Sequence, residues 1–206
     1  MIKFFSIRPF WALSLISLSV SPLCVKQACA QEMQTPRSVH DQNKSQQNLL
    51  RAIQLIDRSM DVYFSGEDFK MHRFYNPFTK VRSEETASVW MYSASIEAVN
   101  AVLSGLKKQQ KVDNGKLYKM YYSRYVDLLA KLHANAAYYL GTFTLTSFTQ
   151  HKEWTVYAVD RVREKGKANV TGVLNVYDDQ MWLVRELLEA YHLTGQDRYL
   201  QEAEYL

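Results

Sequence analysis

Two adjacent aspartates, Asp178 and Asp179, stand where a long helical pattern begins and carry the side chains best suited to chemistry. Glycoside hydrolysis needs two carboxyl groups: one attacks or stabilises the anomeric carbon, and the other protonates the leaving oxygen. Neighbouring Cα atoms lie about 3.8 Å apart, and successive helical side chains point about 100° apart. A carboxyl separation of about 5 Å, as in retaining enzymes, is therefore reachable, whereas about 6.5–9.5 Å for inversion is harder to reach.

The position of the pair could divide these two roles. A helix N-terminus favours an anion, which suits a nucleophile, and two close carboxylates push one of the pair towards its protonated form. The spacing alone does not settle which of the two holds the proton. The alternative is structural, because an aspartate near an N-cap commonly accepts the free N–H groups of the first turn. If the pair is catalytic, both side chains should line one cleft.

Four further residues could contact a sugar. Asn175 and Tyr177 flank the acids and could bind a sugar hydroxyl or orient a carboxylate. Trp90 and Trp182 could stack on sugar rings, and core packing is the alternative for both. No metal or cofactor is expected, because the helical histidines lack a second ligand at metal spacing.

The N-terminus has the pattern of a secretory signal peptide over residues 1–30. Lys3 and Arg8 precede an apolar run from Phe10 to Val20, and Ala28-Cys29-Ala30 resembles a cleavage site before Gln31. The pattern predicts a secreted, periplasmic or cell-surface protein. The apolar run is too short to span a membrane, and no later segment reaches about 20 apolar residues.

Charge and cysteine content exclude further classes of protein. Both cysteines lie in the predicted signal peptide, so the mature chain cannot form an internal disulfide or a thiolate metal site. Three cations of the signal contribute to the net charge of +4, and the remainder is close to neutral, which does not indicate nucleic-acid binding. Residues 31–44 are polar and aperiodic and predict a flexible tether, followed by one domain over residues 45–206.

Apolar periodicity predicts an all-α domain interrupted once. Expected helices run from Ser45 to about Gly66, from about Thr86 to Gln110, from Asp113 to about Gly141, from the acids to Gly195, and from Asp197 onward. A loop is expected between the first two. Residues 142–146 and 154–159 alternate and are rich in β-branched and aromatic side chains, which predicts a β-hairpin inserted before the acidic pair.

Three segments resemble glycoside hydrolase family 76, the endo-α-1,6-mannanases: Val89–Asn100 (VWMYSASIEAVN), Tyr177–Trp182 (YDDQMW) and Glu189–Gly195 (EAYHLTG). The likeness extends from about Ser83 to Leu206, and the Asp-Asp followed by Trp is its most specific part. It implies an (α/α)6 toroid, a mannan-type polysaccharide substrate and a retaining mechanism. Asp178 would then be the nucleophile and Asp179 the acid/base.

The sequence departs from that family in two respects. The predicted hairpin is longer than the family's usual connection, and a complete toroid is longer than this chain. The resemblance therefore predicts an incomplete toroid with about the first five helices, whose own activity is doubtful. Unpartnered helix faces would then be exposed, at Met91, Val102, Leu187 and Tyr191.

Two other classes of function fit the same composition. An exported helical protein with surface aromatics could bind glycans without cleaving them, although such a protein has no use for two adjacent carboxylates in a cleft. A helical-repeat interaction module is suggested by the turn at Thr194-Gly195, but no similar repeat is visible upstream. The oligomeric state is not indicated by the sequence.

Overall fold

The computed structural model describes residues 39–171 and 176–206, and this part of the chain is mostly helical, as predicted. Its five α-helices are α1 (Val39–Tyr63), α2 (Val89–Lys108), α3 (Lys116–Ala136), α4 (Tyr177–Thr194) and α5 (Asp197–Tyr205). The strands pair into three small antiparallel sheets: β1 (Phe64–Ser65) with β2 (Lys70–Met71), β3 (Tyr75–Asn76) with β4 (Val81–Arg82), and β5 (Leu140–Thr146) with β6 (His151–Tyr157). A 3-10 turn at Asp113–Gly115 precedes α3.

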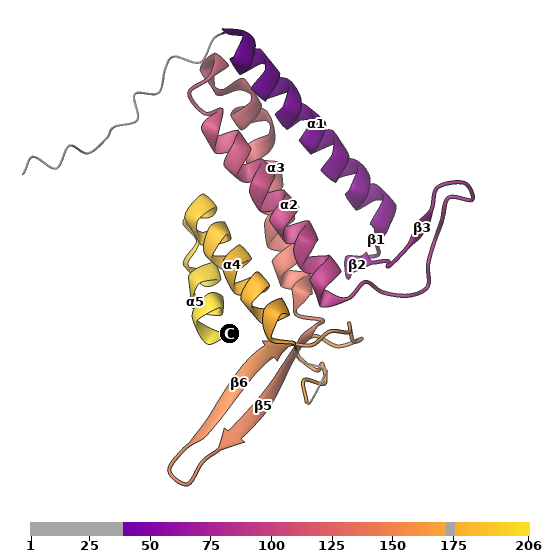
Figure 1. Ribbon diagram of the computed structural model, residues 1–206, viewed down its shortest axis with the longest axis vertical. Helices are drawn as coiled ribbons and strands as arrows, with labels where there is room; N and C mark the ends of the chain where they lie inside the picture. The colour runs from indigo at the N-terminus through magenta and orange to yellow at the C-terminus, as the bar shows by residue number, and fades with distance from the viewer. Residues whose placement is uncertain (1–38, 172–175) are drawn as a thin grey trace, which may run out of the picture. The chain divides into compact units, whose positions relative to one another are not determined.

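Helix α2 is the centre of the helical packing. It contacts α1, α3 and α4, while α5 packs on α4 (Figure 1). The buried face of α2 carries Ile96, Leu103 and Leu106, none of which has accessible surface, and they join one hydrophobic core with residues from all five helices. This face has the apolar spacing that stabilises a helix by tertiary packing.

The ends of the helices follow local signals. The Ser88 hydroxyl accepts a hydrogen bond from Met91 N, so α2 begins at Val89 rather than at the expected Thr86, which instead pairs with His72 in an isolated bridge. The turn between α4 and α5 matches the prediction. Gly195 adopts a left-handed φ of 69° and donates its N–H to Tyr191 O at 2.7 Å.

The predicted β-hairpin is confirmed, with seven residue pairs from Leu140–Tyr157 to Thr146–His151. Gly141 lies in β5 rather than at the end of a helix, and α3 ends earlier, at Ala136. A Cβ at Gly141 would lie 2.1 Å from Ala168 O, so only glycine allows the loop after β6 to cross the base of the hairpin this closely.

Helix α1 begins six residues earlier than expected. Residues 39–44 are helical and continuous with the helix predicted from Ser45, so the predicted tether is wrong for this part. Polar residues such as Asn43 and Lys44 continue the solvent-facing side of a helix whose apolar side begins only at Leu49. The rest of the tether and the predicted signal peptide lie outside the described residues.

The helix faces that were expected to be exposed are largely covered. Val102 and Leu187 are buried, so the expectation is wrong for these two residues, and Met91 and Tyr191 are partly buried. Val102 lies on α2 and Leu187 lies on α4. These two helices pack directly on each other, and this contact helps to bury both side chains. The segment after Tyr63, predicted to be the end of a helix up to about Gly66 and then a loop, instead holds the two small sheets that follow α1.

Candidate active site at the start of helix α4

The acidic pair lies in the first turn of α4 and does not cap it. Val176 is the N-cap residue in extended conformation, and no side-chain hydrogen bond caps the helix. Tyr177 is the first helical residue, followed by Asp178 and Asp179. The geometry therefore does not support N-capping by either aspartate. Both carboxyl groups lie where the helix dipole favours negative charge.

Gln180 attaches this turn to the hairpin. Its Oε1 accepts a hydrogen bond from Tyr157 N at 2.8 Å, and its Nε2 donates to Tyr157 O at 2.6 Å. The buried amide thus pairs with the last residue of β6 as a neighbouring strand would, satisfying both backbone groups. The long predicted insertion therefore has a clear structural role: it positions the N-terminus of α4.

The two aspartates occupy different environments. Asp178 is exposed, whereas Asp179 keeps only 8% of its surface accessible. Burial raises the pKa of Asp179, and the neighbouring Asp178 carboxylate raises it further. Desolvation disfavours the charged form of an acid, so Asp179 is the member of the pair that tends to hold a proton.

Asp178 opens onto a shallow pocket of about 330 Å³, lined by Tyr177, Asp178, Met181, Trp182 and Arg185. Tyr177 is 77% exposed, and Trp182 is partly buried. The structure therefore brings Asp178, Tyr177 and Trp182 together at one pocket. Asp179 is not among the lining residues, because the helix turns its side chain towards the interior. The expectation that both acids line one cleft is met only by Asp178.

Arg185 is a member of this pocket that the sequence did not single out. Its guanidinium lies 4.2 Å from the centroid of the Trp182 ring and bonds to Glu97 at 2.9 Å and Glu186 at 2.8 Å. Arg185 follows Trp182 by three positions, which places both side chains on one helix face, and this spacing was the available signal. The cation holds the indole in place. The indole N–H is buried without a hydrogen-bond partner among the described residues.

Trp90 and Asn175 stand apart from this pocket. Trp90 is 60% exposed in the first turn of α2 and does not line the pocket at Asp178. Val89 N donates to Val159 O at 2.8 Å, so the turn with Trp90 attaches to the chain two residues after the Tyr157 that holds α4. Both helix starts therefore adjoin the same short segment after β6. Asn175 lies outside the described residues.

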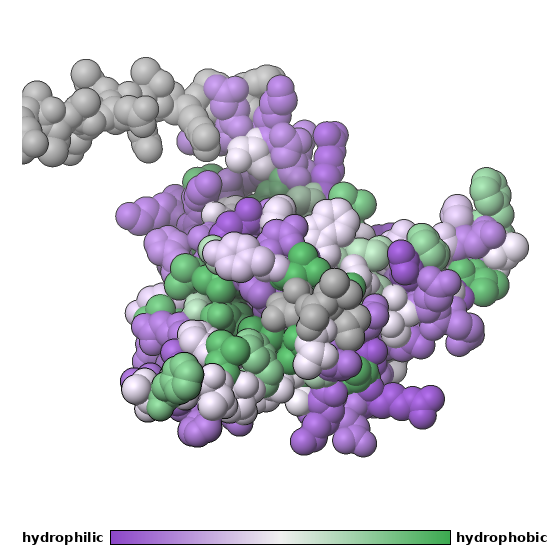
Figure 2. All heavy atoms as spheres, turned by 60° about the horizontal axis from the view of Figure 1, so that its bottom comes forward, coloured by the Kyte–Doolittle hydropathy of each residue, from purple (hydrophilic) through white to green (hydrophobic). Residues whose placement is uncertain are grey.

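Figure 2 brings forward the end of the helices from which the β5–β6 hairpin projects, and hydrophobic side chains there lie among hydrophilic ones. No group of three His, Cys, Asp or Glu side chains in the described ranges could hold a metal ion. Over the same ranges, none of the helices has both the length and the apolar character needed to cross a membrane.

Comparison with known proteins gives no assignment. No protein-family model, curated protein or solved structure matches this chain.

Proposed function

We propose that this chain belongs to an exported glycoside hydrolase of the family 76 type, which cleaves an α-1,6-linked mannan-type polysaccharide with retention of configuration. One observation carries the proposal: two adjacent carboxyl groups occupy opposite environments at one helix start. Asp178 is exposed on an aromatic-lined pocket, whereas Asp179 is buried with a raised pKa. A two-carboxylate glycosidase needs this division between an ionised nucleophile and a protonated acid.

The proposed reaction assigns one task to each carboxyl in each step. Asp178 attacks the anomeric carbon while Asp179 gives its proton to the leaving oxygen, which forms a covalent glycosyl–Asp178 ester. Asp179, now ionised, removes a proton from water, and the resulting hydroxide displaces Asp178 at the same carbon. Tyr177 and Trp182 would pack against the pyranose ring. Asp179 must reach the leaving oxygen from its buried position, which requires the substrate to seat close to the first turn of α4.

Trapping of the covalent intermediate tests the proposal directly. A 2-deoxy-2-fluoro-α-mannosyl fluoride slows the second step and should leave one added sugar on the protein, located on Asp178 by peptide mass spectrometry. Asp179→Asn should still become labelled, because fluoride departs without a general acid, but should not cleave mannan. Asp178→Asn should do neither.

Asp197→Asn is the matched control, because Asp197 is an exposed acid in the first turn of α5. It should keep labelling and mannan cleavage at the level of the unaltered protein. The helix faces at Val102 and Leu187, whose expected exposure made the activity of this chain doubtful, are buried, so activity is expected of the chain itself. Absence of labelling and of mannan cleavage in the unaltered, folded chain would contradict the proposal.

A second candidate function is glycan binding without cleavage. The exposure of Tyr177 and Trp90 favours it, because large exposed aromatic rings are a common means of holding sugars. Titration with α-1,6-mannan oligosaccharides, monitored by tryptophan fluorescence, distinguishes the two. Saturable binding that Asp178→Asn leaves unchanged, together with no product by chromatography, would favour the binding protein.

The proposal extends to the fold. We infer that the helices form part of an (α/α)6 toroid, supported by the hairpin-like succession of α2 with α3 and α4 with α5, and by the direct packing of α4 on α2. An experimental structure in which α2 and α4 are not neighbours in a ring of helix hairpins would contradict this inference.

A further inference from the structure

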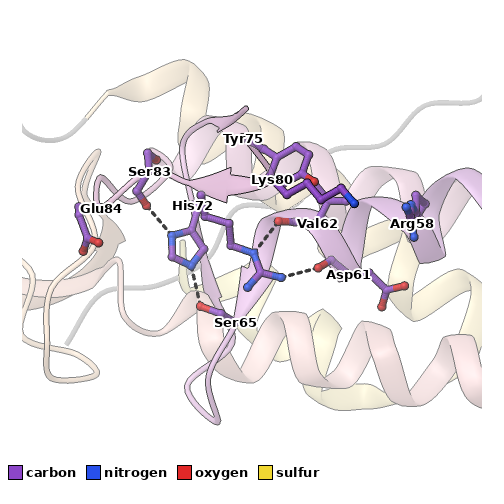
Figure 3. A pocket seen from close by; sticks show the side chains of 10 residues that line it. Arg58, Asp61, Val62, Ser65, His72, Tyr75, Lys80, Ser83 and Glu84 are labelled. Carbon is purple, nitrogen blue, oxygen red and sulfur yellow. Dashed lines mark hydrogen bonds between the residues drawn. The ribbon is translucent and has the colours of Figure 1, made fainter. Parts of the chain in front are cut away.

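A second polar cluster lies in the small sheets that follow α1, away from the acids in sequence. Ser65 Oγ lies 2.6 Å from His72 Nε2, and His72 Nδ1 lies 2.7 Å from the carbonyl oxygen of Ser83. Figure 3 shows the imidazole between these two partners, with one ring nitrogen directed to each. A hydroxyl, an imidazole and an oxygen that orients the imidazole form the arrangement that activates a serine nucleophile.

The carbonyl of Ser83 determines the tautomer of the ring. A carbonyl oxygen can only accept a hydrogen bond, so Nδ1 of His72 must carry a proton. In the neutral imidazole, Nε2 is then unprotonated, and it accepts the hydrogen bond from the Ser65 hydroxyl. This is the tautomer in which a histidine can remove the proton of a serine as a general base. Here the backbone carbonyl takes the orienting place that a carboxylate holds in a Ser-His-Asp triad.

Backbone hydrogen bonds hold all three positions. Ser65 pairs with Lys70 across the β1–β2 sheet, and His72 N donates to Tyr63 O at 2.8 Å. Ser83 N donates to Phe74 O at 2.9 Å. The site is therefore attached to the end of α1 and is built on paired strands, which limits how far the hydroxyl and the ring can move apart.

The pair opens onto a pocket of about 510 Å³ lined by ten residues, most of them polar. Three are cationic (Arg58, Lys80 and Arg82) and two are acidic (Asp61 and Glu84), which leaves an excess of one positive charge. Arg82 forms part of the wall, because its guanidinium donates to Val62 O at 2.7 Å and to Asp61 O at 2.5 Å. Arg58 and Lys80 form no ion pair with any described residue. A polar pocket of this volume suits a short acyl group and an anionic substituent better than a long hydrocarbon chain.

We propose that Ser65, His72 and the Ser83 carbonyl form a serine esterase site for short-acyl esters that carry a negative charge. Ser65 Oγ attacks the ester carbonyl carbon while His72 Nε2 takes the hydroxyl proton. The C–O bond to the alcohol then breaks, His72 returns the proton to the departing oxygen, and an acyl–Ser65 ester remains. Water, deprotonated by His72, attacks this ester and releases the carboxylic acid and free Ser65.

The contrast with another hydroxyl–histidine pair shows why this one is distinctive. Thr146 Oγ1 and His151 Nδ1 lie 3.0 Å apart at the tip of the β5–β6 hairpin, where both side chains are exposed. No described hydrogen bond orients the other nitrogen of His151, and neither residue lines the pockets at Ser65 and Asp178. Of these two pairs, the one at Ser65 combines a fixed tautomer, a partly buried hydroxyl and space for a substrate.

Covalent labelling of the full chain tests the proposal. A fluorophosphonate probe should label Ser65, as shown by peptide mass spectrometry, and 4-nitrophenyl acetate and mono-4-nitrophenyl succinate should be hydrolysed. The succinate should have the lower KM because of its carboxylate. Ser65→Ala should remove labelling, and His72→Gln should lower hydrolysis by about 100-fold or more, since glutamine can form hydrogen bonds but cannot accept the proton.

Ser59→Ala is the control, because the Ser59 hydroxyl donates to Leu55 O within α1 and faces no histidine. It should leave labelling and hydrolysis unchanged. Asp178→Asn should also leave labelling of Ser65 and ester hydrolysis unchanged. A negative result for the esterase site can therefore be distinguished from a negative result for the proposed glycosidase site. The labelling of the unaltered protein does not depend on any variant folding. No label on Ser65, with hydrolysis equal in Ser65→Ala, would show that the cluster only ties the strands together.

Discussion

The start of α4 and the sheets after α1 carry the two sites proposed here, and they prepare their reactive groups by opposite means. At α4, two neighbours in sequence are separated by exposure alone, because Asp178 faces solvent while the helix turns Asp179 inward. At Ser65, groups spread over 19 positions of the chain are joined by two short hydrogen bonds to one imidazole. Burial raises the pKa of Asp179 at the first site, whereas hydrogen-bond geometry sets the tautomer of His72 at the second.

The comparison shows that proton affinity and proton position can be controlled separately. For Asp179, desolvation raises the pKa with no hydrogen bond to a partner side chain among the described contacts. For His72, the carbonyl of Ser83 decides which nitrogen bears the proton. Variants that alter burial should therefore affect the first site, and variants that alter the imidazole should affect the second.

The largest expected effect is a double dissociation of activities. Asp178→Asn should lower mannan cleavage by about 100-fold or more and leave 4-nitrophenyl ester hydrolysis intact, while Ser65→Ala should do the reverse. Initial rates of both reactions on each purified variant provide the measurement. Loss of both activities in either variant would mean that the two sites are one.

Next in size is the removal of the amide that holds α4. Gln180→Ala leaves the buried N–H and C=O of Tyr157 unpaired and should lower the free energy of unfolding by about 2–4 kcal/mol, with a loss of mannan cleavage. Urea denaturation measures the first effect. Ester hydrolysis should persist under folding conditions. Gln201→Ala, on the exposed side of α5, is the control and should change stability by less than about 0.5 kcal/mol.

The pH dependence of stability should identify Asp179. Its pKa is raised on folding, so between the ordinary and the raised pKa the folded state holds a proton that the unfolded state has released. Its contribution to stability is full below the ordinary aspartate pKa and is lost as pH rises through the raised value. Asp179→Asn should therefore raise the melting temperature at pH 7 and give no gain at pH 3, which thermal unfolding followed by circular dichroism would measure.

The corresponding rate profile depends on the same proton. Mannan cleavage needs Asp179 protonated, so kcat should fall as pH rises through its raised pKa. Ester hydrolysis at Ser65 does not use Asp179, so its rate should not show this fall. Superimposable profiles for the two reactions would contradict the assignment of separate groups.

The smallest effect concerns Lys80, whose φ of 57° is unusual for a residue with a side chain. Lys80→Gly relieves this conformation, so stability should stay within about 1 kcal/mol of the unaltered protein. The KM for the succinate ester should rise while that for the acetate ester changes little, because only the succinate carries a charge for Lys80 to attract. Equal changes in both KM values would remove Lys80 from substrate binding.

The two sites also differ in how far the sequence predicted them. The helical class, the β5–β6 hairpin and the turn at Gly195 follow from local periodicity and turn chemistry, and the structure has all three. The acidic pair is visible because its members are adjacent. The burial of Asp179 was not predictable, since it depends on the face that α4 turns towards the core.

The cluster at Ser65 lacked any such local signal. Two-residue strands such as β1 and β2 have too few positions to show an alternating pattern. Ser65 was therefore predicted to end the first helix, and His72 and Ser83 were predicted to lie in the loop after it. The pairing of Ser65 with His72, and of His72 with Ser83, arises from backbone pairing that brings the ends of β1, β2 and β4 together. The role of Gln180 was hidden for the same reason, because its partner Tyr157 lies 23 residues away.

The position of α4 has a consequence for how the molecule assembles. The buried hydrogen bond from Asn100 Nδ2 to Glu186 joins residues 86 positions apart, whereas α2 and α3 are neighbours in the chain. Closing so long a loop is entropically costly, so the α2–α3 pair should form before α4 docks. Asp179 becomes buried only in that last step. Between the ordinary and the raised pKa of the acid, refolding should therefore take up a proton late, which a pH indicator in stopped-flow mixing would detect after most helical signal has returned.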